Sequence, residues 1–272
     1  MPLNAITDDF FQLGPRRGQP GLDRARERIG ASLREYGFAG LTGLRTRADV
    51  LESAHLLLGE LRVHRDSGPD GLTVVRDLGE VAHRAGFGGF GREELLPHTD
   101  GTQVAEPARL VLLACQAGAR SGGESILVDG SAVLRELASA HPDALTALTQ
   151  PRAAYFGGTA GHFAPVLRQI GDGRWQIRLR LDPELARFSP DAEPHLPTLR
   201  DTVRRHLRTV LLRPGQALLI DNSRTLHGRA AFTGERLMLR ALGTPHPRLR
   251  LLPGFAAALD ARCSHGTEQP CA

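Results

Sequence analysis

The N-terminal part of the chain alternates between helical and strand-like patterns of apolar residues. Apolar side chains recur at helical spacing among charged ones over residues 20–36, and Gly37 follows as a helix-ending residue. A short apolar segment over residues 38–41 and a second helical stretch over residues 47–61 come next. The pattern therefore predicts an N-terminal α/β cap over residues 1–70.

Beyond residue 71 the pattern changes to short apolar runs bounded by turn residues, which is typical of strands in a sandwich or barrel. The expected strands cover residues 72–75, 110–115, 126–128, 175–181, 209–212, 217–220 and 237–242. Residues 171–173 predict a hairpin turn, and residues 131–140 and 196–207 predict helical insertions. We expect one mainly β domain with helical decorations over residues 1–272, with its core at 71–250 and a C-terminal tail at 251–272.

The basic residues of the chain exclude several classes of enzyme. All 34 of them are arginine, because the sequence contains no lysine. Schiff-base enzymes, P-loop proteins and protein kinases each need a lysine ammonium group, so none of them fits. The net charge is only +4 and aromatic residues make up 5% of the chain, so a nucleic-acid partner is not expected.

The sequence predicts neither a membrane segment nor a secretion signal. The longest apolar runs, such as residues 110–115, are too short to cross a bilayer. The opening MPLNAITDDFF carries acidic residues where a signal peptide carries positive charge. We therefore expect a cytoplasmic protein without a membrane partner.

Two motifs match catalytic signatures but lack the context that those signatures need. Residues 86–91 fit G-x-G-x-x-G, but a dinucleotide site also needs a preceding strand and a following helix, and Pro97 interrupts the next segment. We expect a flexible loop or lid there. His64-Arg65-Asp66 matches a kinase triplet without the lysine and asparagine that accompany it in kinases.

Two separated segments bring histidine and carboxylate side chains into a pattern that suits a metal ion. His98 and Asp100 are two positions apart, so in a strand both side chains project to one face. The apolar run at 217–220 ends in a polar turn that delivers His227. Two imidazoles and one carboxylate leave three positions of an octahedral ion open, as in the facial triad of non-haem Fe(II) oxygenases.

Arg236 and Arg240 follow His227 within one further strand. Their spacing places both guanidinium groups on the same face of that strand, and a guanidinium fork suits a carboxylate. Taken alone, the segment is equally compatible with an exposed pair of arginines. The alternating Leu237 and Leu239 favour a core-facing side and an arginine side that lines a cleft.

Together these motifs resemble those of a known family. H-T-D at 98–100, S-G-G-E-S at 121–125, I-D-N-S-R-T-L-H-G-R at 220–229 and R-L-M-L-R at 236–240 are similar to motifs of the taurine dioxygenase (TauD/TfdA) family. This family comprises Fe(II)- and 2-oxoglutarate-dependent oxygenases and includes clavaminate synthase. The resemblance covers roughly residues 25–245 and implies a double-stranded β-helix, or jelly roll.

The resemblance also implies a role for each motif residue. Iron would be held by the two histidines and the aspartate named above. Ser125 and Arg236 would bind the far carboxylate of 2-oxoglutarate, and Arg240 would hold an acidic group of the primary substrate. The loop between His227 and Arg236 looks shorter than is usual for the family, so Arg240 could instead be the 2-oxoglutarate clamp.

The implied reaction is hydroxylation of an unactivated C–H bond with O2, releasing succinate and CO2 from 2-oxoglutarate. The expected substrate is a small anionic or zwitterionic metabolite, an amino acid or a derivative in specialised metabolism. Glu94 could meet its ammonium group, and the segment 177–182 resembles a pocket-lining segment of amino-acid hydroxylases, which makes Asp182 a candidate. Oxidative desaturation or cyclisation by the same site, and a catalytically different jelly-roll metal-binding protein, are the alternatives.

Overall fold

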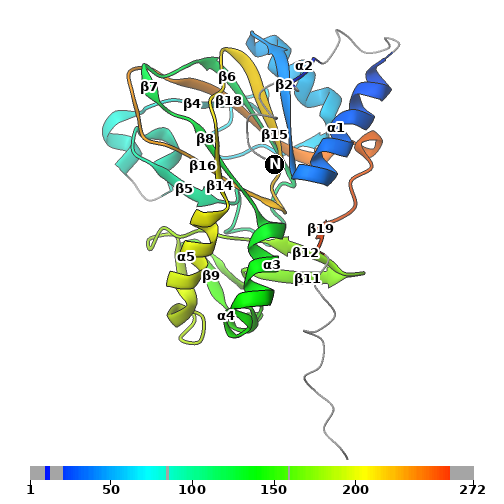
Figure 1. Ribbon diagram of the computed structural model, residues 1–272. Coiled ribbons are helices and arrows are strands. Elements are labelled where there is room, and N and C mark those ends of the chain that lie inside the picture. The colour runs from blue at the N-terminus through cyan, green and yellow to red at the C-terminus, as the bar shows by residue number, and fades with distance from the viewer. Residues whose placement is uncertain (1–9, 13–20, 84–85, 159, 258–272) are drawn as a thin grey trace, which may run out of the picture.

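Two β-sheets form the centre of the protein (Figure 1). The computed structural model describes residues 10–12, 21–83, 86–158 and 160–257. The larger sheet has seven strands, in the order β1 (Phe11–Gln12), β2 (Phe38–Leu44), β15 (Gly215–Asp221), β6 (Leu110–Ala117), β18 (Leu237–Pro245) and β3 (Leu58–Leu61), with β4 (Thr73–Val75) also paired to β18. Its neighbouring strands are antiparallel except for β1 and β2.

The second sheet carries the residues on which the functional argument depends. Its four antiparallel strands run in the order β14 (Leu207–Val210), β8 (Ser125–Asp129), β16 (Thr225–Arg229) and β5 (Leu95–His98). The remaining strands form three small sheets. One contains β10 (His162–Ala164), β9 (Ala154–Phe156) and β13 (Ala186–Phe188), and another contains β11 (Leu167–Gly171), β12 (Arg174–Ile177) and β19 (Phe255–Ala256). The third pairs β17 (Phe232–Thr233) with β7 (Ser121–Gly122).

Side chains alternate along the strands of the large sheet and so form two apolar layers. On β6, Leu110 and Leu112 pack on the outer side of the sheet, whereas Val111 and Cys115 pack in a cluster with Leu127 of β8. This second cluster joins the two sheets face to face. Each fully buried leucine in such layers contributes roughly 1.5–3 kcal/mol to folding.

Helices cover the sheets on two sides. The helices α1 (Leu22–Tyr36) and α2 (Arg47–Leu57) pack on the outer apolar layer of the large sheet. The helices α3 (Gly130–Ala140), α4 (Pro142–Leu148) and α5 (Leu196–Arg205) gather with β9, β11 and β12 at the other end of the molecule (Figure 1). Short 3-10 turns cover Gly79–His83, Gly88–Phe90, Glu193–His195 and Pro247–Leu249. No helix in the described part of the chain is long and apolar enough to cross a bilayer.

The mainly β character with added helices is confirmed, and most expected elements are present. Gly37 ends α1 in a left-handed conformation with φ 83°, and a Cβ there would lie 2.3 Å from Thr225 Oγ1, so the position requires glycine. The residues expected as an N-terminal cap contribute β2 and β3 to the large sheet itself. Residues 38–44 and 58–61 are therefore part of the central sheet.

Two expected elements end early, and tertiary contacts explain both. The second helix stops at Leu57, because residues 58–61 pair with β18 as strand β3. The strand expected over 175–181 stops at Ile177, whose N–H donates to the Ser223 carbonyl at 2.9 Å, and Leu179 then bonds to Thr99. The helix α4 was not expected from the sequence. The expected tail at 251–272 is described only to residue 257.

The packing of the outer layer predicts the effect of a truncation in β6. Leu112 is fully buried at the middle of the large sheet, so Leu112→Ala should lower the free energy of unfolding by about 2–5 kcal/mol, because it leaves a cavity. Leu211→Ala is the matched control, since Leu211 is 59% exposed, and it should change stability by less than about 0.5 kcal/mol. Urea unfolding followed by circular dichroism measures both; equal losses would contradict this packing.

Candidate metal centre

His98 and His227 lie opposite each other on neighbouring strands. His98 ends β5, His227 lies in the middle of β16, and the antiparallel register pairs the two residues directly. Their ring centroids are 4.7 Å apart and both side chains are buried. Gly228 permits this close approach, because a Cβ there would lie 2.4 Å from the Leu95 carbonyl oxygen.

Asp100 joins the two histidines from a turn. The strand β5 ends at His98, and the chain turns so that Asp100 Oδ1 lies 3.5 Å from His98 Nε2 and 3.6 Å from His227 Nε2. The possible ligand atoms of the three residues all lie within 4.8 Å of one another. Neighbouring ligands of an ion with bonds of about 2.1 Å lie about 3 Å apart, so only a small contraction is needed to hold a metal.

Asn222 fixes the backbone of Asp100. Its Oδ1 accepts the Asp100 N–H at 2.7 Å, and its Nδ2 donates to the carbonyl oxygens of Asp100 and Ala108, both at 2.9 Å. Asn222 is buried at 3% exposure, so water does not replace these bonds. One side chain from the turn before β16 therefore sets the position of the carboxylate after β5.

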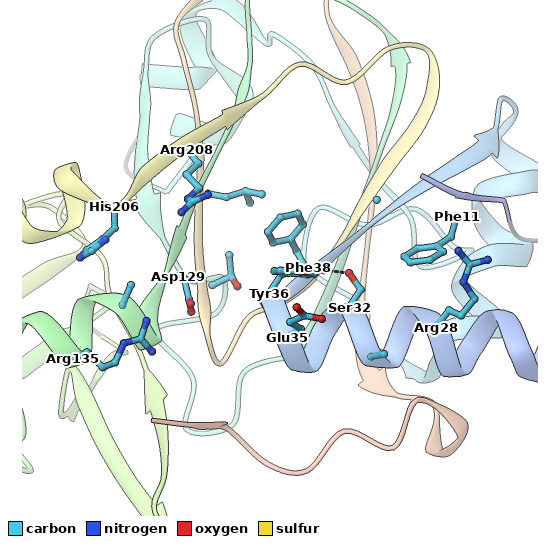
Figure 2. Close-up of a pocket in the computed structure, with 15 residues that line it drawn as sticks. Phe11, Arg28, Ser32, Glu35, Tyr36, Phe38, Asp129, Arg135, His206 and Arg208 are labelled. Carbon is cyan, nitrogen blue, oxygen red and sulfur yellow. Dashed lines mark hydrogen bonds between the residues drawn. The ribbon is translucent and has the colours of Figure 1, made fainter. Parts of the chain in front are cut away.

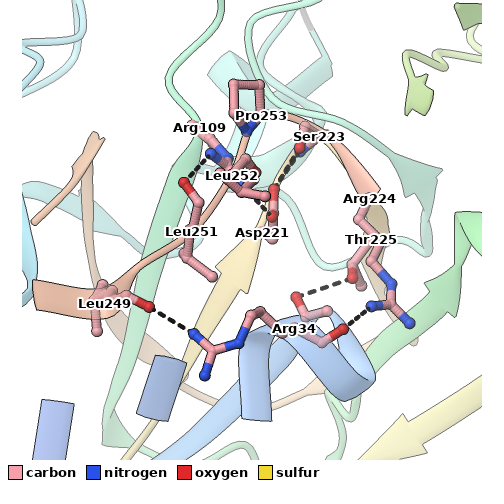
Figure 3. A network of polar contacts seen from close by, with 12 residues as sticks. Arg34, Arg109, Asp221, Ser223, Arg224, Thr225, Leu249, Leu251, Leu252 and Pro253 are labelled. Carbon is pink, nitrogen blue, oxygen red and sulfur yellow. Dashed lines mark hydrogen bonds and ion pairs between the residues drawn. The ribbon is translucent and has the colours of Figure 1, made fainter. Parts of the chain in front are cut away.

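The turn that carries Asn222 is itself held by a polar network (Figure 3). The Asp221 carboxylate accepts hydrogen bonds from the N–H and the hydroxyl of Ser223, at 3.0 and 2.6 Å, and pairs with Arg109 at 3.1 Å. Arg224 donates to the carbonyl oxygen of Arg34 at 2.6 Å and forms an ion pair with Asp129. The polar run before His227 thus fixes the angle between β15 and β16.

The hydrogen bonding of His98 defines its protonation. Its Nδ1 lies 2.8 Å from the Leu96 carbonyl oxygen, which only accepts, so Nδ1 carries the proton and Nε2 offers its lone pair to the site. Burial and the nearby charge of Arg180 lower the pKa of His98 to about 4. The imidazole is therefore neutral near pH 7, as a metal ligand must be.

Asp100 is charged and its outer oxygen is occupied. Burial alone would raise the pKa of Asp100, but the positive charge of Arg240 holds it well below its usual value. Arg240 donates to Oδ2 at 3.1 Å, which leaves Oδ1 turned toward both histidines. Arg240 shares its face of β18 with Met238 and Leu242, which pack between the sheets. The arginine thus orients the carboxylate.

Arg236 and Ser125 form a second polar group in the interior. Arg236 is buried at 8% exposure, burial lowers its pKa, and no carboxylate within the described residues pairs with it. Its guanidinium lies 5.8 Å from the Phe232 ring centroid. Ser125 Oγ is buried without a hydrogen-bond partner in the same part of the structure, and Ser125 is paired with Arg229, a close neighbour of Arg236. A buried cation and a buried hydroxyl, each close to Arg229 and each without a partner in the described residues, suit an anion.

A cavity of about 420 Å³ is lined by His98 and Asp100, two of the three clustered residues. The glycine-rich segment lines it through Gly89 and Phe90, and residues 88–90 form a 3-10 turn. The triplet 64–66, which matched a kinase motif, also lines this cavity. Arg65 contacts the glycine-rich segment, since it stacks on the Phe87 ring at 4.7 Å and its Nη2 lies 3.4 Å from the Gly86 carbonyl oxygen. Neither motif therefore lies remote from the site.

Ser125 and Arg236 are not among the residues that line this cavity, and neither are the expected substrate contacts Glu94 and Asp182. Glu94 is exposed and does not line it. Asp182 is half-buried and forms an ion pair with Arg180 at 2.6 Å instead of facing the cavity. Arg180, which sequence reasoning missed, does line the cavity, and so does Glu184. The sequence did indicate this region, because Arg180 lies in the segment 177–182, in which Asp182 is the residue expected to contact the substrate.

A second cavity of about 530 Å³ lies between α1, β2 and β14 (Figure 2). Arg28, Glu35 and Asp129 are among the side chains that line it, and none of the three clustered residues does so. Within the described residues, only His98, Asp100 and His227 form a group that could hold a metal ion. The smaller cavity is therefore the candidate site.

Comparison with protein families decides the affiliation of the chain. Residues 16–242 match the model of the family described as "Taurine catabolism dioxygenase TauD, TfdA family". The chain belongs to this family. Of its 272 residues, the match includes every residue of the clustered group and both interior arginines.

Curated relatives of this TauD/TfdA family member are dioxygenases. The chain is 31% identical over 157 residues to the mitochondrial trimethyllysine dioxygenase of Gallus gallus, covering 51% of this chain and 38% of that protein. It is 30% identical over 173 residues to the uridine-5′-phosphate dioxygenase of a Streptomyces species, covering 56% of this chain and 62% of that protein. The chain thus spans less than two thirds of either relative's length.

Two solved structures of oxygenases are similar to this family member in fold. Asparagine oxygenase in complex with Fe(II), hydroxyasparagine and succinate matches with a TM-score of 0.65 and 19% identity, covering 82% of each chain. The non-haem iron oxygenase OrfP in complex with Fe and α-ketoglutaric acid matches with a TM-score of 0.61 and 20% identity, covering 88% of each chain. At these identities the likeness concerns the fold.

The clamp on Asp100 predicts the effect of removing it. Asn222→Ala deletes three hydrogen bonds and leaves the Asp100 N–H buried without a partner, so the affinity for Fe(II) should fall about 10- to 100-fold. Ser139→Ala is the control, because Ser139 is an exposed residue of α3 whose hydroxyl donates to the Glu136 carbonyl, and it should change affinity by less than about threefold. Anaerobic calorimetry measures both variants; equal affinities for Asn222→Ala and the wild type would contradict the clamp.

The lowered pKa of His98 predicts how acid destabilises the metal-free protein. An unfolded histidine takes up its proton near pH 6.5 and folded His98 only near pH 4, so between these values the unfolded chain binds more protons. The free energy of unfolding should therefore fall as pH falls through this window, by at most about 3 kcal/mol. Urea unfolding at pH 7.5 and pH 5 measures the loss. A loss of the same size in His98→Gln would show that another group causes it.

Proposed function

We propose that this protein is an Fe(II)- and 2-oxoglutarate-dependent oxygenase that hydroxylates a small anionic or zwitterionic metabolite. The observation that carries the proposal is the buried group of two imidazoles and one carboxylate, of which His98 and Asp100 line a cavity. Membership of a dioxygenase family supports it. So do the names of the relatives, all of which are dioxygenases or iron oxygenases.

The residues of the site fit an Fe(II) ion. His98 Nε2 is free of its proton, and Asp100 Oδ1 is free of hydrogen bonds because Arg240 takes Oδ2. A site of two histidines and one carboxylate is the donor set of non-haem Fe(II) enzymes, which leave positions open for other ligands. We infer that His98, Asp100 and His227 hold the iron on one face.

The unpaired groups in the interior fit the far carboxylate of 2-oxoglutarate. Arg236 brings a buried positive charge without a carboxylate partner in the described residues, and Ser125 brings a free hydroxyl. We infer that these two residues bind that carboxylate. Arg240 is already paired with Asp100, which supports Arg236 as the clamp and gives Arg240 an orienting role.

The two packed sheets support a finer description of the fold. We propose that the seven-stranded and four-stranded sheets form the double-stranded β-helix, or jelly roll, of this class of oxygenase. His98 and His227 then lie on the smaller sheet and face into the space between the sheets. Because β2 and β3 belong to the same large sheet, the chain acts as one catalytic domain.

When bound, Fe(II) and 2-oxoglutarate supply the oxidising chemistry, in which O2 is consumed, 2-oxoglutarate yields succinate and CO2, and a substrate C–H bond becomes C–OH. The chain supplies orientation. Asn222 and Arg240 fix the Asp100 carboxylate from two sides, and the Leu96 carbonyl keeps the proton of His98 on Nδ1. Burial of the site between the sheets excludes bulk water from the reacting groups.

An amino acid or a derivative is the substrate class that we propose. The structures with similar folds hold hydroxyasparagine in asparagine oxygenase and hydroxylated arginine in OrfP. The cavity carries both signs of charge, with Arg180 and Arg240 on one hand and Asp66 and Glu184 on the other. Such a lining suits a ligand that has a carboxylate and an ammonium group.

A spectroscopic titration tests the cofactor assignment. Anaerobic protein with Fe(II) should develop the visible charge-transfer band of keto-acid chelation when 2-oxoglutarate is added. In Arg236→Ala the concentration that gives half of the band should rise about 10- to 100-fold, because one charge-assisted pair is lost. Arg92→Ala is the control, since Arg92 is exposed and pairs with Asp77, and it should match the wild type. Absence of a band in the wild type at any concentration would refute the assignment.

A further inference from the structure

Arg180 is placed beside the metal centre by bonds to the turn that carries the ligands. The residue between His98 and Asp100 is Thr99, whose N–H donates to the Leu179 carbonyl at 2.9 Å and whose hydroxyl accepts the Leu179 N–H at 3.2 Å. Leu179 is fully buried. The position of Arg180 is therefore set by the same turn that positions Asp100, and its side chain lines the cavity.

The guanidinium of Arg180 has donors to spare. Its side chain is only 14% exposed, and Nε lies 2.6 Å from Asp182 Oδ2. A guanidinium has five N–H donors, and within the described residues Asp182 is the only acidic group in ion-pair contact with it. In the described part of the chain no hydrogen bond occupies the two terminal nitrogens, so they can donate to a ligand that accepts hydrogen bonds.

The other cavity arginines are committed to protein groups. Arg240 pairs with Asp100 at 3.1 Å and so is tied to the metal ligand. Arg65 is 58% exposed, pairs with Asp66 and stacks on Phe87. Arg180 is thus the buried guanidinium of this cavity that remains available to a ligand in the described structure.

We propose that the guanidinium of Arg180, held in place by Asp182, binds the oxyanion group of the primary substrate, a carboxylate or a phosphate. This inference rests on the proposed function, because it assigns a subsite of the same cavity. A guanidinium fork matches both oxyanions through two parallel hydrogen bonds. Asp182 then acts as a positioning residue for Arg180 and does not contact the substrate.

The subsite at Arg180 also sets the orientation of the rest of the substrate. An oxyanion fixed at Arg180 leaves its other end toward Asp66 and Glu184, which line the same cavity. An ammonium group is therefore the group that fits this end. The substrate class is an oxyanion-bearing molecule with a cationic or polar remainder, bound with its anionic end near His98.

Matched pairs of ligands test the subsite. Anaerobic protein with Fe(II) and 2-oxoglutarate is first checked for the charge-transfer band and then titrated calorimetrically. The probes are the standard amino acids with their carboxamides, and nucleoside 5′-monophosphates with the corresponding nucleosides. Each pair differs only in the oxyanion, so the ratio of the two affinities measures its recognition, and the two sets distinguish a carboxylate from a phosphate.

The variants separate three contributions, namely the two-pronged hydrogen bonding of the Arg180 guanidinium, its positive charge and its positioning by Asp182. In the wild type one set should bind about 10- to 100-fold more tightly than its neutral partners. Arg180→Gln should bring that ratio close to one, and Arg180→Lys should restore part of it. Asp182→Asn should lower the ratio while leaving Arg180 in place. Arg187→Gln, an exposed arginine on β13, should leave the ratio unchanged.

The outcomes are distinguishable from a failure of the proposed function. A ratio in Arg180→Gln equal to that of the wild type would overturn the subsite. So would a wild type that shows the charge-transfer band but binds no oxyanion probe. A wild type without the band would overturn the proposed function, and the subsite with it. A ratio lost in Arg180→Gln with an unchanged affinity for 2-oxoglutarate would establish the subsite.

Discussion

The pairing of β5 with β16 is the constraint on which the site depends. It places His98 and His227 side by side on two strands that are more than a hundred residues apart in sequence. The turn before β16 then reaches across with Asn222 and holds the backbone of Asp100. The three side chains are therefore assembled by one register and one clamp. A slip of one residue in that register would place the two imidazoles on opposite faces of the sheet.

Burial between the two sheets gives these groups their chemical character. Away from water, His98 is neutral, Asp100 is held ionised by Arg240, and Arg236 carries a charge that no carboxylate of the described residues balances. Each of these states would be less pronounced at the surface, where solvent screens charges. The same burial that stabilises the apolar layer on β6 thus prepares the site for a cation at one position and an anion at another.

The sequence predicted the residues of this site better than their surroundings. The spacing of His98 and Asp100 and the apolar strand before His227 are local patterns, and the structure brings these residues together. The contacts of Arg240 and Asp182 are not local, because each depends on a partner brought in by the fold, namely Asp100 and Arg180. The choice between Arg236 and Arg240 requires knowledge of which of them pairs with Asp100, and only the fold shows that this is Arg240.

The fold shows the same division. Helix α1 and its end at Gly37 follow from local spacing and a local glycine, and both are as expected. The end of α2 at Leu57 depends on a pairing with β18, nearly two hundred residues away, which periodicity does not reveal. The sequence likewise does not reveal the role of Asn222, because its partner Asp100 lies in the turn after β5, far away along the chain.

The central claim is that three side chains hold one Fe(II) ion. Anaerobic calorimetric titration with Fe(II) tests it most directly, on the wild type, on His98→Ala, Asp100→Ala and His227→Ala, and on Glu94→Ala as an exposed control close in sequence. We expect one ion per chain for the wild type and the control, with affinity lost in each of the three ligand variants. Fe(II) binding of wild-type strength in any of those three would contradict it.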